Sequence, residues 1–448
     1  MRKSKQNSNR NISDQFQNHS ANENHHISGE FLLSEEENEL LERIQRQTFR
    51  YFWDFAHPSS GMARERNSEA FQDVVTTGGT GFGLMAMIVA TQRNWISKDA
   101  FLNRIGLIID FLTHCDRYQG AFSHWYQGAT GKTIPFHKKD DGADLVETAF
   151  LITGLLTVRQ YLQSWEEEKS RLLIQKIQSL WLNVGWNRFT RGKNVLHWHW
   201  SPFQTRQIGL KIEGYNEALI AYILAAASPT DPIEKKVYDE GWARGGLLKN
   251  GSKFYDTELP LGPDFGGPLY FAHYSFLGLD PRNLQDAYTH YWQQNVAHTK
   301  IQTNHCIVNP KGHKGYGTHC WGLSACDSGK RYHPHHPLKD NGTICPSAAI
   351  ASLPYLPQEV MAAIRHFYYT LGEKIWGEMG FFDSFNATRS RYARSYLAIN
   401  QGPIIIMIEN YRTGLLWNLF MSCPEVKEGL LKLGFTRNQM HDDGVPSS

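Results

Sequence analysis

The feature that most constrains the fold of this 448-residue sequence is a regular alternation of two kinds of predicted helix. Helices that are apolar on every side are buried, whereas helices with one polar face lie outside them. Six of each kind in alternation predict an all-α fold, an (α/α)6 double-ring barrel. The predicted inner helices span about 80–92, 143–161, 212–227, 267–277, 345–353 and 401–411, and the predicted outer helices span about 34–56, 97–117, 166–183, 232–242, 283–297 and 357–375.

The segments between these helices indicate one folded domain. Ser34 and Glu37 form a capping-box pattern at the start of the first helix. Strand-like alternation is confined to short pieces such as 195–200, which predict small β-hairpins in the rim loops. No Pro/Ser-rich linker divides the chain, so a single domain is predicted over 34–437. The polar segment 1–33 is expected to be a disordered tail, and 438–448 a flexible C-terminal tail.

Composition excludes two classes of protein. The formal net charge of +2 is too balanced for a dedicated nucleic-acid binder. No stretch of about 18 apolar residues exists, so no membrane partner is predicted. The first 30 residues hold no apolar signal core, which predicts a cytoplasmic protein; a misassigned start site would make it periplasmic or secreted.

Four acids stand directly before one predicted inner helix, in the motif DDGADLVE. On a helix Asp140, Asp144 and Glu147 would share a face, where like charges are destabilising, so the cluster indicates a chemical role. Paired carboxylates are typical of chemistry on sugars. Helix capping is the alternative; it explains Asp140 or Asp141 well, Asp144 less well and Glu147 poorly.

A second pair of acids, Glu213 and Glu217, is predicted at the start of the next inner helix. The apolar run after Glu217 places it in the core or at the floor of a cleft. Burial raises a carboxyl pKa, as a general acid requires. The alternative is a buried glutamate satisfied by a neighbouring Arg or Tyr.

Several other residues are candidates for binding a sugar. Trp125 follows His124, and Trp198 and Trp200 lie in the HWHW segment; these aromatic, His-rich segments suit stacking on sugar rings, although HWHW equally fits a strand. Arg64 lies with Glu65 and Arg66 before a glycine cluster, 78–83, whose spacing is not a nucleotide-binding fingerprint, and all three are candidates for binding sugar hydroxyls at the rim. Asp383 lies in an aromatic loop and is a candidate water-activating base. Glu409 is better interpreted as a buried ion pair with Arg412 or another arginine.

The six cysteines are too sparse for a disulfide framework. A histidine-rich loop is favoured over a zinc site between residues 319 and 345, because the spacing matches no standard zinc pattern. The residues concerned are Cys320, Cys326, His333, His335, His336 and Cys345. No metal or other cofactor is therefore predicted.

Long contiguous motifs across about 36–435 resemble the bacterial glycoamylase-like domain of endo-β-1,2-glucanases and of the cyclic β-1,2-glucan synthase module. The motifs include TFRYFWDFAHPSSGMARER, KDDGADLVETAFLITGLL and EGYNEALIAYILAAASPTDPI. The resemblance implies an (α/α)6 barrel and metal-independent hydrolysis of β-1,2-linked glucan. It also implies that the functional acids are Asp140, Asp144, Glu147 and Glu217. Secreted members carry export signals, and this sequence shows none.

These observations predict a glycoside hydrolase whose partner is a β-1,2-glucan, most simply endo-acting and inverting. Glu217 is the expected acid, and Asp144 or Glu147 the expected base. Asp140 would bind sugar hydroxyls or tune its neighbours, and Asp141 and Glu213 are further candidates for binding substrate. The alternatives are a transglycosylase of the same fold and a non-catalytic glucan-binding protein. The oligomeric state is left open.

Overall fold

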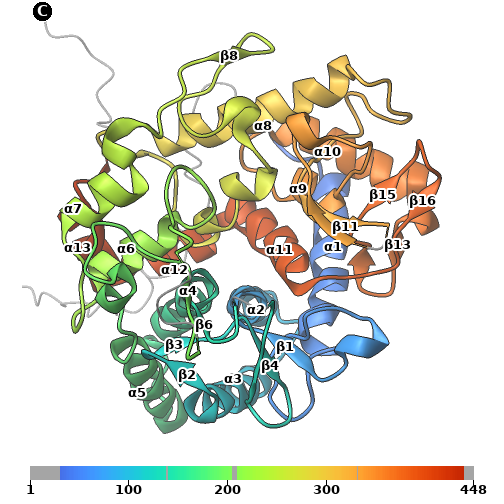
Figure 1. Cartoon of the computed structure of the whole chain (residues 1–448). Helices are drawn as coiled ribbons and strands as arrows, with labels where there is room; N and C mark the ends of the chain where they lie inside the picture. The colour runs from blue at the N-terminus through green and yellow to red at the C-terminus, as the bar shows by residue number, and fades with distance from the viewer. Residues whose placement is uncertain (1–30, 138–139, 204–208, 330, 438–448) are drawn as a thin grey trace, which may run out of the picture. The chain divides into compact units, whose positions relative to one another are not determined.

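The computed structural model describes residues 31–137, 140–203, 209–329 and 331–437. Almost all of the two predicted tails, 1–33 and 438–448, lies outside these ranges. Within the helical unit that begins at Glu35, the predicted alternation is confirmed (Figure 1). Among the described residues, no helix has the length and apolar character needed to cross a membrane.

The inner positions are held by helices that are buried on every side or nearly so. They are α2 (Thr77–Gln92), α4 (Leu145–Leu162), α6 (Leu219–Ala227), the 3-10 turns Leu269–Ala272 and Ser275–Leu277, α9 (Pro346–Ile350) and α11 (Ala398–Thr413). The outer positions are held by α1 (Glu35–Trp53), α3 (Lys98–His114), α5 (Glu168–Leu182), α7 (Lys235–Val237), α8 (Tyr291–Val308) and α10 (Pro357–Arg365).

The structure departs from the predicted helices in several places, besides the shorter lengths of helices such as α6 and α10. The fourth inner position is not an α-helix, because Gly266 and Gly267 adopt positive φ values and only two short 3-10 turns follow. The outer helix predicted from 283 starts only at Tyr291, since β10 (Leu284–Gln285) pairs with β17 (Thr436–Arg437). Two unpredicted short helices, α12 (Leu415–Ser422) and α13 (Pro424–Leu433), follow α11 and pack against α4 and α6.

The glycine cluster allows two inner helices to touch backbone to backbone. A Cβ on Gly81 of α2 would lie 2.3 Å from the Phe150 carbonyl oxygen of α4. A Cβ on Gly154 would lie 2.2 Å from the Gly81 carbonyl oxygen. These glycines therefore serve close helix packing, as the sequence indicated, and fix the spacing of α2 and α4.

We expect Gly154→Ala to destabilise the protein by about 3 kcal/mol, because neither backbone can yield to the added methyl group. Gly106→Ala in outer helix α3 is the matched control, since its new Cβ would meet only Leu173 at 3.9 Å. Alanine favours a helix over glycine, so the control should gain roughly 0.5 kcal/mol. Urea denaturation of both variants measures the difference; equal stabilities would contradict the tight crossing.

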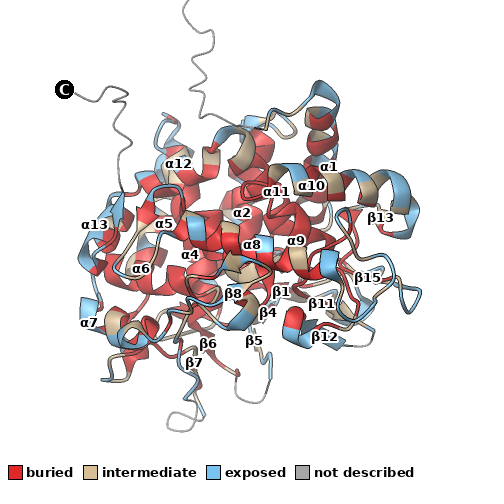
Figure 2. Cartoon of the chain, turned by 90° about the horizontal axis from the view of Figure 1, so that it is seen from above, coloured by how far each residue is buried: buried red, intermediate tan, exposed pale blue. Residues whose placement is uncertain are grey.

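The strands are short, and several form the predicted hairpins, whereas others pair segments that lie far apart in the sequence. The strands that surround the inner-helix N-termini gather at one end of the double ring (Figure 2). We call this end the rim. Its strands are β1 (Val74–Thr76), β4 (Trp125–Gln127), β5 (Thr133–Ile134), β6 (Ala143–Asp144), β7 (His199–Trp200), β11 (Ala325–Ser328), β12 (Arg331–Pro334), β15 (Phe385–Asn386) and β16 (Arg391–Tyr392). The segment 195–200 does not form a hairpin by itself: β7 pairs with β6, which brings the aromatic segment beside the DDGADLVE acids.

Candidate active site

A cavity of about 450 Å³ opens at the rim, where the N-terminal ends of α2, α4, α6 and α11 converge. It brings together five residues predicted from the sequence: Asp144, Glu147, Glu217, Trp125 and Trp198. The other polar and aromatic lining residues are Glu65, Arg66, Thr76, His124, Phe136, Phe150, Tyr270, Tyr274 and Tyr332. Acids from two neighbouring inner-helix starts therefore share one cavity with several aromatic rings.

Asp144 is the N-cap of α4, which begins one residue later. Its Oδ1 accepts hydrogen bonds from the backbone N–H groups of Val146 (2.9 Å) and Glu147 (3.0 Å). Its Oδ2 accepts from Trp198 Nε1 (3.3 Å) and lies 3.0 Å from His124 Nδ1. Because Asp140 and Asp144 precede the helix, the prediction that they share a helical face with Glu147 was wrong. Capping also falls to Asp144 and not, as the sequence favoured, to Asp140 or Asp141.

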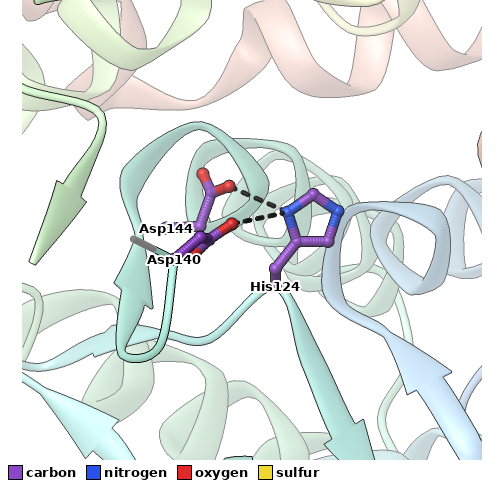
Figure 3. A group of neighbouring side chains, drawn as sticks. All are labelled: His124, Asp140 and Asp144. Carbon is purple, nitrogen blue, oxygen red and sulfur yellow. Dashed lines mark hydrogen bonds and ion pairs between the residues drawn. The ribbon is translucent and has the colours of Figure 1, made fainter. Parts of the chain in front are cut away.

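His124 joins three of the acids, and Figure 3 shows its contacts with two of them, Asp140 and Asp144. Its Nδ1 lies 3.0 Å from Asp144 Oδ2 and 3.3 Å from Asp140 Oδ2, and its Nε2 lies 3.9 Å from Glu147 Oε1. Phe136 stacks on the imidazole with ring centroids 4.1 Å apart. Burial opposes the charged imidazolium, but the surrounding carboxylates outweigh it and raise the pKa of His124 well above 6.5.

Asp140 is buried behind His124 and does not line the cavity. Its Oδ2 lies 3.5 Å from His199 Nε2 as well as beside His124. Burial alone would raise its pKa, yet the two histidines overcome this effect and lower the pKa of Asp140 to about 2. Asp140 is thus an ionised partner for the two histidines.

Glu147 and Glu217 both line the cavity, and the pKa of each carboxyl group is raised toward neutral pH. Burial raises the pKa of Glu147 to about 7, although His124 opposes the shift, and its Oε2 accepts a hydrogen bond from Gly78 N at 2.6 Å. A Cβ on Gly78 would lie 2.6 Å from that same oxygen. Burial also raises the pKa of Glu217 to about 7, and the negative charges of Asp144 and Glu147 add to the shift.

Besides Asp140, five candidates predicted from the sequence lie outside the cavity lining: Arg64, Asp141, Trp200, Glu213 and Asp383. Arg64 donates to the carbonyl oxygens of Gln72 and Phe55. The ring of Trp200 packs on Phe189, and Asp141 is half-buried.

The other two candidates, Glu213 and Asp383, lie outside the cavity because of the local structure around them. Glu213 is exposed, because α6 begins only at Leu219 and the predicted helical pairing with Glu217 does not form. Asp383 is buried, and its oxygens accept from Asp327 N (2.6 Å) and Asn400 Nδ2 (2.7 Å). Glu409 forms the predicted buried ion pair, with Arg93 Nε at 2.6 Å.

Of the three neighbouring residues predicted to line the rim, Glu65 and Arg66 line the cavity and pair with each other at 3.1 Å, whereas Arg64 does not line it. Alternation along an extended segment would separate Glu65 from Arg64 but would group Arg66 with Arg64, so no local signal selects this pair. Tyr270 and Tyr274 were missed in the sequence. Tyr270 and Tyr274 stack at 5.1 Å between centroids, four residues apart in the sequence.

Among the described residues, one group of three or more potential ligands has its atoms within 4.8 Å: His124, Asp140 and Asp144. The Cys/His segment between 319 and 345 contributes no such group within the described ranges. The His–Asp–Asp group fits a divalent cation by ligand type. It also contains a cation of its own, because the imidazolium of His124 already faces both carboxylates.

EDTA is therefore expected to leave the hydrolysis predicted from the sequence unchanged, since His124 already supplies a positive charge between the carboxylates. The measurement is the initial rate after dialysis against EDTA and again after Ca²⁺, Mg²⁺ or Zn²⁺ is added. A large loss that a cation restores would assign this group to metal binding.

Comparisons with known proteins agree with this architecture. A family model described as "Putative glucoamylase" matches residues 209–424, and one described as "Protein of unknown function (DUF3131)" matches residues 43–169. The crystal structure of a "putative glucoamylase" from Bacteroides uniformis is 50% identical, with a TM-score of 0.88 over 91% of this chain and 99% of that chain. The chain belongs to the glycoamylase-like family.

Other members of the glycoamylase-like family have more specific descriptions. The structure of an endo-β-1,2-glucanase from Chitinophaga pinensis, in complex with sophorotriose and glucose, is 48% identical, with a TM-score of 0.87 over 90% of this chain and 99% of that chain. An exo-β-1,2-glucooligosaccharide sophorohydrolase (non-reducing end) from Parabacteroides distasonis is 42% identical over 417 residues, which are 88% of this chain. The match spans 58% of the length of that curated relative. The fold extends further, to an endo-β-1,2-glucanase from Talaromyces funiculosus at 10% identity and a TM-score of 0.64.

Proposed function

We propose that this protein is a glycoside hydrolase that cleaves β-1,2-linked glucan with inversion of the anomeric carbon. The observation that carries the proposal is that Glu147 and Glu217 face one cavity in different electrostatic surroundings. Burial raises both pKa values to about 7, so near neutral pH one carboxyl group can hold a proton while the other is ionised, as an acid and a base on opposite sides of a glycosidic bond require. The glucan specificity is supported by the two relatives named for β-1,2-glucans.

Glu217 is the proposed general acid. Its neighbours in the cavity are the carboxylates Asp144 and Glu147, and both raise its pKa. A proton on Glu217 is therefore retained near neutral pH and is available for the leaving glycosidic oxygen.

Glu147 is the proposed general base. The sequence left Asp144 and Glu147 as alternatives, and their hydrogen bonds separate them. All four acceptor positions of Asp144 are engaged by backbone N–H groups, Trp198 and His124, so none is free to take a proton from water. Within the described ranges, the ion pair of Glu147 Oε1 is with His124 Nε2, at 3.9 Å, and that cation favours the ionised form that a base needs.

The aromatic walls suit a sugar chain. Six aromatic rings that could contact a sugar line the cavity: Trp125, Phe136, Trp198, Tyr270, Tyr274 and Tyr332. Sugar C–H faces pack on aromatic rings, and Glu65 and Arg66 supply an acceptor and donors for hydroxyl groups. Endo action is proposed because the endo-acting relative is matched over 99% of its length at 48% identity.

Product analysis on β-1,2-glucan, laminarin and starch tests the proposal. We expect cleavage of β-1,2-glucan alone, a series of oligosaccharides, and an α-anomer at the new reducing end by NMR. If sophorose were the sole product, the enzyme would be exo-acting and not endo-acting. If the new reducing end were a β-anomer, the mechanism would be retaining and not inverting.

The same experiment separates the two other classes of function. A constant number of reducing ends during chain redistribution would indicate a transglycosylase. Tight binding without turnover would indicate a glucan-binding protein. Cleavage of starch would contradict the β-1,2-glucan assignment.

A further inference from the structure

A second cavity, of about 940 Å³, lies between the hairpins β11–β12 and β15–β16. The β11–β12 hairpin separates it from the catalytic cavity. Ala325, Tyr332 and Pro334 line the catalytic cavity, whereas Asp327 and Ser328 line the second one. We call it the arginine cavity and define it by six of its lining residues: Arg389, Arg391, Arg394, Asp327, Ser328 and Thr343.

The charge of the arginine cavity is positive. Three guanidinium groups face one carboxylate, Asp327, and that carboxylate is already neutralised from behind. Arg66 Nη1 lies 3.1 Å from Asp327 Oδ1, and Ser395 Oγ donates to Asp327 Oδ2 at 2.6 Å. Arg66 also lines the catalytic cavity, so this ion pair links the two sites.

Two of the three arginines lack an acidic partner. Throughout the described ranges, no carboxylate lies within 4.0 Å of the guanidinium of Arg389 or Arg391. Arg394 is held differently: its Nη1 donates to the Glu373 carbonyl oxygen, and its guanidinium lies 4.8 Å from the Phe382 centroid. Like charges without a counterion repel each other, so the arrangement favours an anionic ligand.

The walls of the arginine cavity are fixed by buried hydrogen bonds. Asn386 accepts from Arg389 N at 3.0 Å and donates to Thr343 Oγ1 at 3.2 Å, which holds the turn that carries the arginines. Arg391 reaches across to the opposite hairpin, where its Nη1 lies 3.0 Å from the position of a Cβ on Gly329. Gly329 has a φ of +73° and leaves room for that guanidinium.

We propose that the arginine cavity is a second binding site that takes an oxyanion, such as a carboxylate or phosphate group carried on a sugar. Guanidinium groups bind such oxyanions through paired N–H donors, and Ser328 and Thr343 add hydroxyl groups for the polyol part. The shared hairpin and the Arg66–Asp327 pair place this site beside the catalytic cavity, where a substituted glucan would reach both. The saccharide part of the ligand rests on the proposed function, whereas the oxyanion part does not.

Binding measurements on the full chain test the proposal and distinguish the sources of the oxyanion. Calorimetry on Glu217→Gln, at low ionic strength, compares three probes: inorganic phosphate, an unsubstituted β-1,2-glucan oligosaccharide and the same oligosaccharide after succinylation. We expect the succinylated sugar to bind roughly tenfold more tightly than the unsubstituted one. Adding Arg389→Gln and Arg391→Gln should abolish this advantage.

The matched control is Arg46→Gln with Arg171→Gln, which removes the same charge from exposed positions on outer helices α1 and α5. Phosphate binding that requires Arg389 and Arg391, without any glucan binding, would support the oxyanion site and contradict the glucan assignment. The proposal would be overturned if the two sugars bound with equal affinity and phosphate binding did not depend on Arg389 and Arg391. It would also be overturned if the control variant lost as much affinity for the succinylated sugar as the Arg389→Gln and Arg391→Gln variant.

Discussion

Replacing Glu217 with glutamine is expected to reduce the hydrolysis of β-1,2-glucan about a thousandfold or more. Glutamine keeps the shape of the side chain but has no proton to give to the leaving oxygen. Glu213→Gln is the matched control, because Glu213 lies in the same EGYNEA motif yet is exposed and outside the cavity. That control should retain normal turnover.

The same substitution should stabilise the protein at alkaline pH. The pKa of Glu217 is raised from 4.5 to about 7 on folding, so its contribution to stability is present below pH 4.5 and is lost as the pH rises through about 7. At pH 8 the wild type therefore buries a charge that the variant lacks. We expect Glu217→Gln to be more stable there by on the order of 2 kcal/mol, with no difference below pH 4.5.

Steady-state rates and urea denaturation at pH 4, 6 and 8 measure both effects. If Glu217→Gln is inactive and is more stable than the wild type at pH 8, both predictions are confirmed: the variant has lost the general acid and no longer buries a charge. Near-normal turnover would remove Glu217 from the mechanism, and unchanged stability at pH 8 would contradict its burial.

Replacing His124 with glutamine should destabilise the protein by about 3 kcal/mol near pH 6, because it removes the cation shared by Asp140, Asp144 and Glu147. The pKa of His124 is raised well above 6.5 on folding, so its stabilising contribution is complete below pH 6.5 and is lost as the pH rises through the higher folded value. The difference from wild type should therefore narrow above pH 7.

His124→Gln should also change the pH dependence of activity. Without the imidazolium, the pKa of Glu147 rises further and the proposed base is neutral over a wider range. The acidic limb of the rate profile should move to higher pH. His114→Gln is the control, since His114 is exposed at the end of α3. If the acidic limb of the rate profile is unchanged in His124→Gln, then His124 does not control the protonation of the proposed base, Glu147.

The double ring could be predicted from the sequence because burial imposes a visible pattern on whole helices. Segments such as 401–411 are apolar on every side, and α11 is buried through Asn410. The fourth inner position could not be predicted in detail, since Gly266 and Gly267 were interpreted as the start of a helix and instead replace its first turn. The short helices α12 and α13 were not predicted, because an (α/α)6 barrel accounts for twelve helices and these two are additional.

The acidic residues of the site could be predicted from the sequence, but the way their side chains are arranged could not. Asp144, Glu147 and Glu217 were identified because charged residues beside apolar runs require an explanation. Their roles depend on contacts between distant segments, such as Trp198 with Asp144 across 54 residues and Gly78 with Glu147 across 69. His124 was considered as an aromatic sugar platform, because nothing in the local sequence reveals the carboxylates that surround it.

The hydrogen bond from Gly78 to Glu147 has a consequence for engineering. The proposed base takes its position from the first turn of α2, at the same helix crossing that Gly81 and Gly154 hold together. Substitutions that enlarge small residues in this crossing to raise thermal tolerance would shift the carboxylate by the same movement. Turnover number and melting temperature should thus change together in a library of variants at this crossing. A plot of one against the other would measure how strongly helix packing and catalysis depend on each other.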